Sequence, residues 1–164
     1  MRTALLALLL SLGTITASAQ SLPDFGSIRL NVKEDYDDKA NEAALTAATH
    51  LLSTPLDDAN RRAALSYVIR WMTGSPHYSF SLDAKAMRFT KSNDDLLGLY
   101  MAGMARFALE NKDKAADAKA VNIGGLQHVA NYAANPANGV KLNSELKKLI
   151  KANQAGKLAE YLGG

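Results

Sequence analysis

The side chains that could do chemistry in this 164-residue chain are few and widely spaced. Ser144 and Lys147 have Ser-x-x-Lys spacing, which at a helix start places an amine one turn from a hydroxyl group, where it can act as a base. The motif is short enough to occur by chance, and the Lys-Thr-Gly segment that would complete such a site is absent. We therefore predict that Ser144 caps a helix.

Potential metal ligands do not fall at the spacings that metal sites use. The acidic run "EDYDDKANE" over 34–42 fails the calcium-loop pattern, because Lys39 and Ala40 stand at the fifth and sixth positions counted from Asp35. Each of the three histidines lacks a partner at a zinc-ligand spacing in its own segment. No glycine-rich phosphate loop occurs either. We predict no metal and no cofactor.

Arg106 is the one cation in the middle of the most apolar stretch after the N-terminus. A buried charge is costly unless it is paired. Three placements follow from this: the side chain reaches the surface, pairs with an acid such as Asp83 or Asp117, or faces a ligand pocket.

Aromatic and methionine side chains are concentrated in one region. Five of the eleven aromatic residues lie in 67–89, and every methionine after Met1 lies in 72–104. In one interpretation the segment 74–91, which begins "GSPHYSFSLD", covers the end of a helical bundle and completes its core. In the other, the region forms a groove with adaptable walls. The candidate binding residues of that groove are Arg70, Trp71, His77, Tyr78, Phe80, Asp83 and Arg106.

Apolar periodicity predicts an all-α fold that positions these residues. About five helices pack as antiparallel hairpins, with an irregular or extended insert between the second and third. The second helix begins at a Thr54-Pro55 cap and ends at Gly74, and Ser92 caps the third. The other helices are expected at 37–52, 93–110, 113–134 and 144–162.

The third predicted helix is apolar in nearly every direction and is therefore expected at the centre of the bundle. Gly98 and Gly103 mark points where neighbouring helices approach it closely. Gly124-Gly125 indicates a kink or a close crossing in the fourth helix. Gly156 is a weak point in the fifth.

The turn "ALENKDKAADAKA" (108–120) resembles the turn of a tetratricopeptide hairpin. The other positions of that 34-residue repeat do not line up, and no second copy occurs in register. We interpret this part of the chain as a helical hairpin outside that family.

The N-terminus has the pattern of a secretory signal peptide, with one positive charge, an apolar run and Ala17-Ser18-Ala19 before the cut. We predict a signal peptide at 1–19, an extended arm at 20–36 and a single helical domain at 37–164. The localisation is then exported, either periplasmic or extracellular. No segment after the cut is apolar enough to span a membrane, and the absence of cysteine leaves the fold without disulfides.

Removing Arg2 leaves 18 basic and 16 acidic residues, which is too close to balance to indicate a nucleic-acid partner. The leading hypothesis is an exported, non-enzymatic module that binds a protein or peptide through the Met/aromatic groove. One alternative is a carrier of a small apolar ligand, which needs a closed cavity of roughly 300 Å³ or more. The other is a small hydrolase, which needs two of a set of polar side chains to meet within hydrogen-bond reach at a concave site. That set is His77, Ser79, Asp83, Arg106 and His128. The oligomeric state stays open.

Overall fold

The computed structural model describes residues 21–90 and 93–163, and these residues form helices and connecting loops without a strand. The all-α prediction is confirmed. The α-helices are α1 (Asp38–Ser53), α2 (Arg61–Gly74), α3 (Asp94–Glu110), α4 (Ala118–Ala134), α5 (Ser144–Gln154) and α6 (Leu158–Gly163). Short 3-10 helices lie between them: η1 (Lys33–Asp35), η2 (Ala86–Thr90), η3 (Lys112–Lys114) and η4 (Pro136–Asn138). The predicted signal peptide and Ser92 lie outside the described residues.

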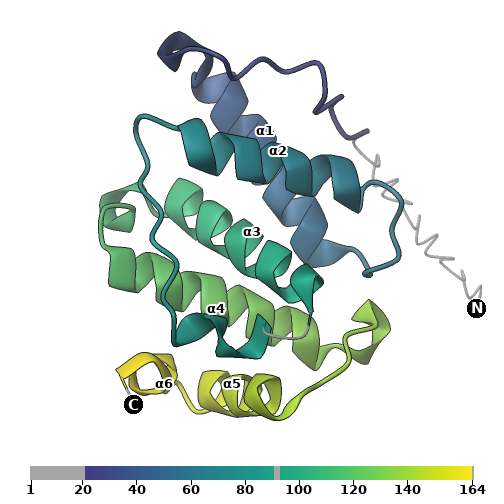
Figure 1. Cartoon of the computed structure of the whole chain (residues 1–164), viewed down its shortest axis with the longest axis vertical. Helices are drawn as coiled ribbons and strands as arrows, with labels where there is room; N and C mark the ends of the chain where they lie inside the picture. Colours follow the sequence, from purple (N-terminus) through teal and green to yellow (C-terminus); the bar gives the residue numbers. More distant parts are fainter. Residues whose placement is uncertain (1–20, 91–92, 164) are drawn as a thin grey trace, which may run out of the picture.

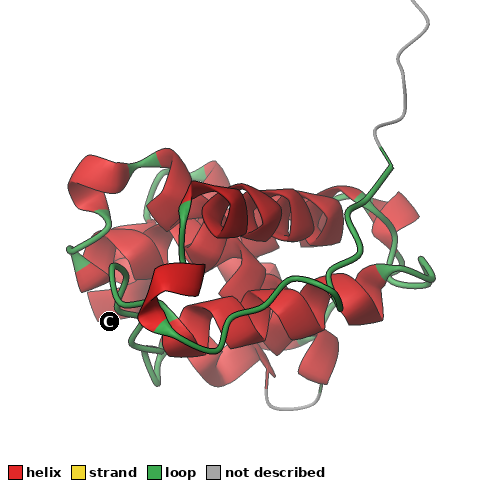
Figure 2. Cartoon of the chain, turned by 90° about the horizontal axis from the view of Figure 1, so that it is seen from above, coloured by secondary structure: helices red, strands yellow, loops and turns green. Residues whose placement is uncertain are grey.

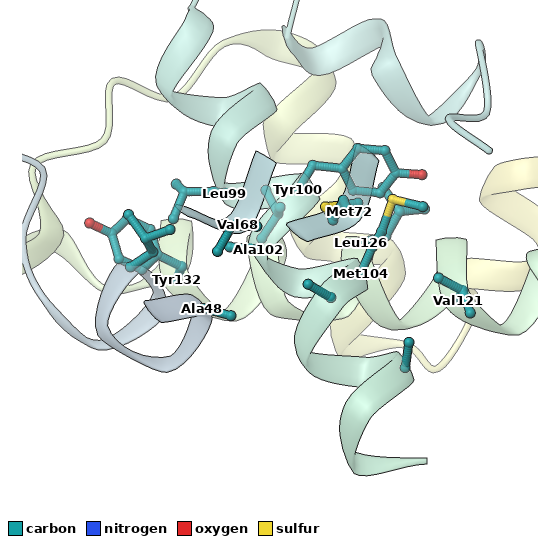
Figure 3. Packing of buried hydrophobic residues seen from close by; sticks show 14 of the residues in the cluster. Ala48, Val68, Met72, Leu99, Tyr100, Ala102, Met104, Val121, Leu126 and Tyr132 are labelled. Carbon is teal, nitrogen blue, oxygen red and sulfur yellow. The ribbon is translucent and has the colours of Figure 1, made fainter. Parts of the chain in front are cut away.

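Helix α3 lies at the centre of the bundle, as its all-round apolar surface predicts. It packs against α1, α2 and α4, and α4 in turn contacts α5 and α6 (Figure 1). Most of its side chains are buried, while Leu97 and Met101 are half-buried. Figure 3 shows the core, in which Ala48, Val68 and Met104 from three different helices belong to one cluster.

The closest helix crossing lies between α3 and α4, where glycines predicted close approach. A Cβ atom on Gly103 would lie 2.9 Å from the carbonyl oxygen of Gly125. A Cβ atom on Gly124 would lie 2.2 Å from the Phe107 ring. The glycines therefore let two helix backbones meet at a distance that any side chain would prevent.

The second helix begins six residues later than predicted, at Arg61 instead of Pro55. Thr54 ends α1, because its backbone N–H and its hydroxyl both donate to the carbonyl oxygen of His50. The turn that follows is held by Asp58, whose Oδ1 lies 2.9 Å from His50 Nε2 and accepts from the N–H of Asn60. The Thr54-Pro55 pair thus closes one helix, and α2 starts only at Arg61.

Asparagine and aspartate side chains cap the later helices. The sequence predicted serine caps for two of them and an earlier start for α4. Asn93 Oδ1 accepts from the N–H of Asp95, and Asn143 Oδ1 accepts from the N–H of Leu146. Ser144 is therefore the first residue of α5 and not its cap, which corrects that prediction. Helix α4 begins at Ala118 instead of 113, because η3 precedes it and Asp117 is the cap.

The predicted helix over 144–162 is two helices. Gly156 has φ of +68°, in the left-handed region that ends an α-helix, and α6 starts two residues later. The position of the break agrees with the weak point expected at Gly156.

The N-terminal arm packs on the bundle instead of extending into solvent (Figure 2). Phe25 is 3% exposed, and its ring centroid lies 5.4 Å from that of Tyr67. Arg70 Nη2 donates to the Phe25 carbonyl oxygen at 2.8 Å. The hydroxyl of Tyr36 donates to the carbonyl oxygen of Leu30 at 3.3 Å. Residues 21–36 therefore contribute to the core, with η1 where the alternating pattern of 28–33 ends.

Candidate functional site

The aromatic segment after α2 is built on one buried side chain, Trp71. Its indole Nε1 donates to Asn41 Oδ1 at 3.0 Å, which fixes the ring between α1 and α2. The Tyr78 and Phe80 rings lie 5.2 and 5.7 Å from it, measured between centroids. Trp71 has no exposed surface, and its two aromatic neighbours are half-buried. A ligand at this surface would meet Tyr78 and Phe80, with Trp71 as their rigid support.

A shallow groove with a volume of about 520 Å³ lies beside these rings. We call it the 72–80 groove, and its lining residues are Met72, Thr73, Ser75, Pro76, His77, Tyr78, Ser79 and Phe80. His77 and Ser79 are exposed at its rim. Polar side chains and one methionine therefore surround the two aromatic rings.

The backbone beyond α2 runs from Tyr78 to Asp83 without a helix, turn or bend, as one long loop (Figure 1). Among the described residues, the N–H groups of residues 77–82 have no hydrogen-bond partner. The carbonyl oxygens of Tyr78, Phe80 and Leu82 have none either. Such a segment is ordered by its side chains and not by a hydrogen-bond ladder.

Asn122 of α4 anchors the end of this segment. Its Nδ2 donates to the Ser81 carbonyl oxygen at 2.9 Å, and its Oδ1 accepts from the Asp83 N–H at 3.1 Å. In an extended chain the N–H and C=O of one residue point to the same side, and successive residues alternate. The Ser81 C=O and the Asp83 N–H therefore face α4, and the N–H and C=O of Leu82 between them point away from it.

The Asn122 amide is only 5% exposed and uses both of its ends. Besides the loop, it accepts a short hydrogen bond from the Tyr100 hydroxyl and donates to the Ala118 carbonyl oxygen at 2.7 Å. Burial raises the pKa of Tyr100, so this hydroxyl remains a donor at neutral pH. Sequence reasoning missed Asn122, because no local pattern links it to a loop 39 residues away.

The seven predicted binding residues do not form one site. His77, Tyr78 and Phe80 line the 72–80 groove, and Trp71 supports it from below. Arg70 points to the N-terminal arm, and its guanidinium lies 5.5 Å from the Tyr67 ring centroid.

Asp83 and Arg106 lie elsewhere. Asp83 Oδ1 accepts from the N–H groups of Lys85 and Ala86 ahead of η2, at 2.8 and 3.0 Å. Arg106 is partly exposed, and its Nε donates to Glu110 at 2.8 Å. Its partner is therefore the acid one turn ahead, and neither Asp83 nor Asp117.

The side chains named in the hydrolase hypothesis do not form one site. His77 and Ser79 line the 72–80 groove without a hydrogen bond between them in the described chain, and Asp83 lies ahead of η2. Arg106 and His128 line one pocket, but no hydrogen bond joins them. In the described part of the chain, no group of three or more His, Cys, Asp or Glu side chains could hold a metal ion. Within 21–90 and 93–163, no helix combines the length and apolar character needed to cross a bilayer.

The carrier hypothesis requires an enclosed apolar cavity. The 72–80 groove and the other pockets, with volumes from about 320 to 520 Å³, open to solvent. Comparison with protein-family models, with curated proteins and with solved structures finds no match to this chain. Its function must therefore be argued from the geometry of its own surface.

Proposed function

We propose that this chain is an exported, non-enzymatic helical module that binds an extended protein or peptide segment alongside residues 78–82. The observation that carries the proposal is the backbone edge formed by Tyr78, Phe80 and Leu82 in a segment without helix, turn or bend. Its N–H and C=O groups have no partner among the described residues. A peptide can add to such an edge as a second strand, forming main-chain hydrogen bonds with it.

The surroundings favour this mode of binding because they hold the edge in place before a partner arrives. Trp71 fixes Tyr78 and Phe80 from below, and Asn122 fixes Ser81 and Asp83 from the side. A preorganised backbone loses little conformational entropy on binding. The flexible Met72 side chain in the adjoining groove can adjust to different partner side chains.

Export rests on the N-terminal sequence. We propose cleavage between Ala19 and Gln20, which releases a chain that is close to charge balance and suits a protein partner more than a nucleic acid. Expression of the full chain in a bacterium, followed by mass spectrometry of the periplasmic fraction, tests this. The expected species begins at Gln20. A product that retains Met1 in the cytoplasm contradicts it.

Binding is tested with a random-peptide display library selected on the protein from residue 20 onward. The affinity of the selected peptides is then measured by fluorescence anisotropy. Leu82→Pro removes one outward N–H, and Leu82→Ala removes the same exposed side chain but keeps the N–H. We expect Leu82→Pro to weaken binding about tenfold more than Leu82→Ala, because a main-chain hydrogen bond contributes about 1 kcal/mol and its neighbours in the ladder are disturbed.

Ser79→Pro serves as the second control, because in an extended backbone the N–H of residue 79 points to the side opposite that of residue 82. It should weaken binding much less than Leu82→Pro, and circular dichroism establishes that each variant folds. Equal affinities for Leu82→Pro and Leu82→Ala, or a library that yields no binder, would contradict strand addition at this edge.

A further inference from the structure

A second pocket lies away from residues 78–82, where the end of α1 meets α3, α4 and η4. We call it the asparagine pocket. It has a volume of about 370 Å³ and is lined by Leu52, Ser53, Arg106, His128, Asn131, Tyr132, Asn135 and Asn138. Three amides, one guanidinium and one imidazole in a pocket of this size are an unusual concentration for a chain whose surface is otherwise mixed.

The hydrogen bonds inside the protein decide which groups remain for a ligand. Asn131 Oδ1 accepts from Asn153 Nδ2 at 2.8 Å, and Asn135 Oδ1 accepts from the Ala137 N–H at 3.1 Å. Each amide oxygen therefore already accepts one hydrogen bond within the protein. The Nδ2 groups of Asn131 and Asn135 have no partner among the described residues, and they remain as donors.

Arg106 also has only some of its donor groups bonded within the protein. Its Nε donates to Glu110 Oε1 at 2.8 Å, and its two Nη groups form no hydrogen bond within the described chain. The Nη pair is the end of the guanidinium that binds a carboxylate with two parallel hydrogen bonds. Glu110 thus orients Arg106 and leaves this end available.

Asn138 has the opposite arrangement. Its Nδ2 donates to the Tyr132 carbonyl oxygen at 2.8 Å, which leaves its Oδ1 as an acceptor. His128 also lines the pocket. Burial first, and then Arg106, lower the pKa of this histidine, against the opposing effect of Glu110. A neutral imidazole offers one donor and one acceptor, and it adds no positive charge that would attract an anion indiscriminately.

We propose that the asparagine pocket binds a small hydroxy-carboxylate. The carboxylate oxygens accept from the Arg106 Nη groups and from the Nδ2 groups of Asn131 and Asn135. A hydroxyl of the ligand donates to Asn138 Oδ1. The donors of the pocket thus face the carboxylate of the ligand, and Asn138 Oδ1 faces its hydroxyl. The proposal does not depend on peptide binding at residues 78–82.

Lactate, glycerate and gluconate are the probes, titrated at constant ionic strength into ¹⁵N-labelled protein that starts at residue 20. The signals to follow are the side-chain NH₂ groups of Asn131 and Asn135 and the Arg106 Nε–H. At least one probe should shift all three signals saturably. Methyl glucoside, which has hydroxyls but no carboxylate, should shift them weakly and without saturation.

Asn135→Asp is the decisive variant. An aspartate at this position can still accept from the Ala137 N–H, so η4 keeps its cap, but the donor becomes a negatively charged acceptor. We expect the dissociation constant of the best probe to rise at least about tenfold. Asn60→Asp makes the same chemical change on an exposed side chain without a capping bond, and it should change the constant less than about twofold.

Three results would overturn the proposal. The first is the absence of saturable shifts with every hydroxy-carboxylate. The second is binding of methyl glucoside as tight as that of gluconate. The third is an equal loss of affinity in Asn135→Asp and Asn60→Asp, which would indicate a general charge effect and no site.

Discussion

Replacing Gly103 by alanine tests the close crossing of α3 and α4 on which the bundle depends. The added Cβ atom would lie 2.9 Å from the Gly125 carbonyl oxygen, 3.1 Å from the Gly125 Cα atom and 3.0 Å from the His128 Cβ atom. Two of these are backbone atoms, and the third is attached directly to the backbone. None can move without displacing α4 itself.

Two opposing effects set the magnitude. Alanine is favoured over glycine in a helix interior by about 1 kcal/mol. Overpacking of a dense core costs about 1–3 kcal/mol, and contacts with a rigid backbone belong at the upper end of that range. The free energy of unfolding should therefore fall by about 2 kcal/mol. For a chain of this size the melting temperature should fall by about 6 °C.

Gly98→Ala in the same helix is the matched control. Its Cβ atom would meet only the end of the Leu65 side chain, with Cδ2 at 3.0 Å and Cδ1 at 3.1 Å, and this half-buried side chain can rotate away. The helix-propensity gain is the same in both variants. Their difference in unfolding free energy, measured by urea denaturation followed by circular dichroism, therefore reports packing alone.

We expect Gly98→Ala to match or slightly exceed the stability of the wild type. The unfolding free energy of Gly103→Ala should lie about 2 kcal/mol below that of the wild type. If Gly103→Ala is as stable as Gly98→Ala, α3 and α4 do not cross as closely as described. The close approach of α3 and α4 at Gly103 and Gly125 would then lose its main support.

Three further predictions concern single residues. Asn122→Leu leaves the Tyr100 hydroxyl and a loop carbonyl without partners, so the unfolding free energy should fall by about 3 kcal/mol in urea denaturation, and proteolysis within 77–82 should accelerate. Gly156→Ala places a Cβ at φ of +68° with no atom within 4 Å, so it should cost about 1 kcal/mol of strain alone, measured by the same method. Burial and the nearby Arg106 lower the pKa of His128 below its ordinary 6.5, so the unfolded chain binds more protons there. The unfolding free energy should therefore fall as the pH drops below 6.5. His128→Gln should weaken this dependence of the unfolding free energy on pH, measured by thermal melts at a series of pH values.

The helices and their central member could be predicted from the sequence, because they follow from apolar periodicity and from small residues at crossings. Helix α3 is an example: its apolar residues occur in every direction, and only a central position buries them all. Gly103 and Gly125 indicated the crossing for an equally local reason. Such features depend on residues a few positions apart in the same element.

Helix boundaries were less predictable, since several residues in one loop can cap. Thr54-Pro55 has the composition of a helix start, yet the Thr54 N–H and hydroxyl satisfy the carbonyl oxygen at the end of α1. The choice is decided by Arg61, whose Nη1 donates to the carbonyl oxygens of Leu51 and Thr54 at 2.7 and 2.9 Å. That guanidinium also lies 5.5 Å from the Tyr132 ring centroid, a contact no local pattern shows.

The candidate site was likewise predictable where it depends on neighbouring residues and not where it depends on contacts distant in the sequence. The density of aromatic residues in 74–83 is a local signal, and it correctly drew attention to Tyr78 and Phe80 near Trp71. The orientation of the backbone is not a local property, because it depends on an amide of α4. Asn122 binds the backbone of both Ser81 and Asp83, and these two bonds turn one side of the segment toward the bundle.

An unpaired extended segment is a liability in most proteins, because it can pair with any exposed strand. In this chain the liability is limited to one edge and about five residues, since Asn122 orients the other edge toward α4 and Pro76 precedes the segment. The segment spans the side of the bundle from the end of α2, past α3, to η2 (Figure 1). This path keeps Tyr78 and Phe80 over Trp71, and the proposal of strand addition depends on the backbone edge that it leaves without partners.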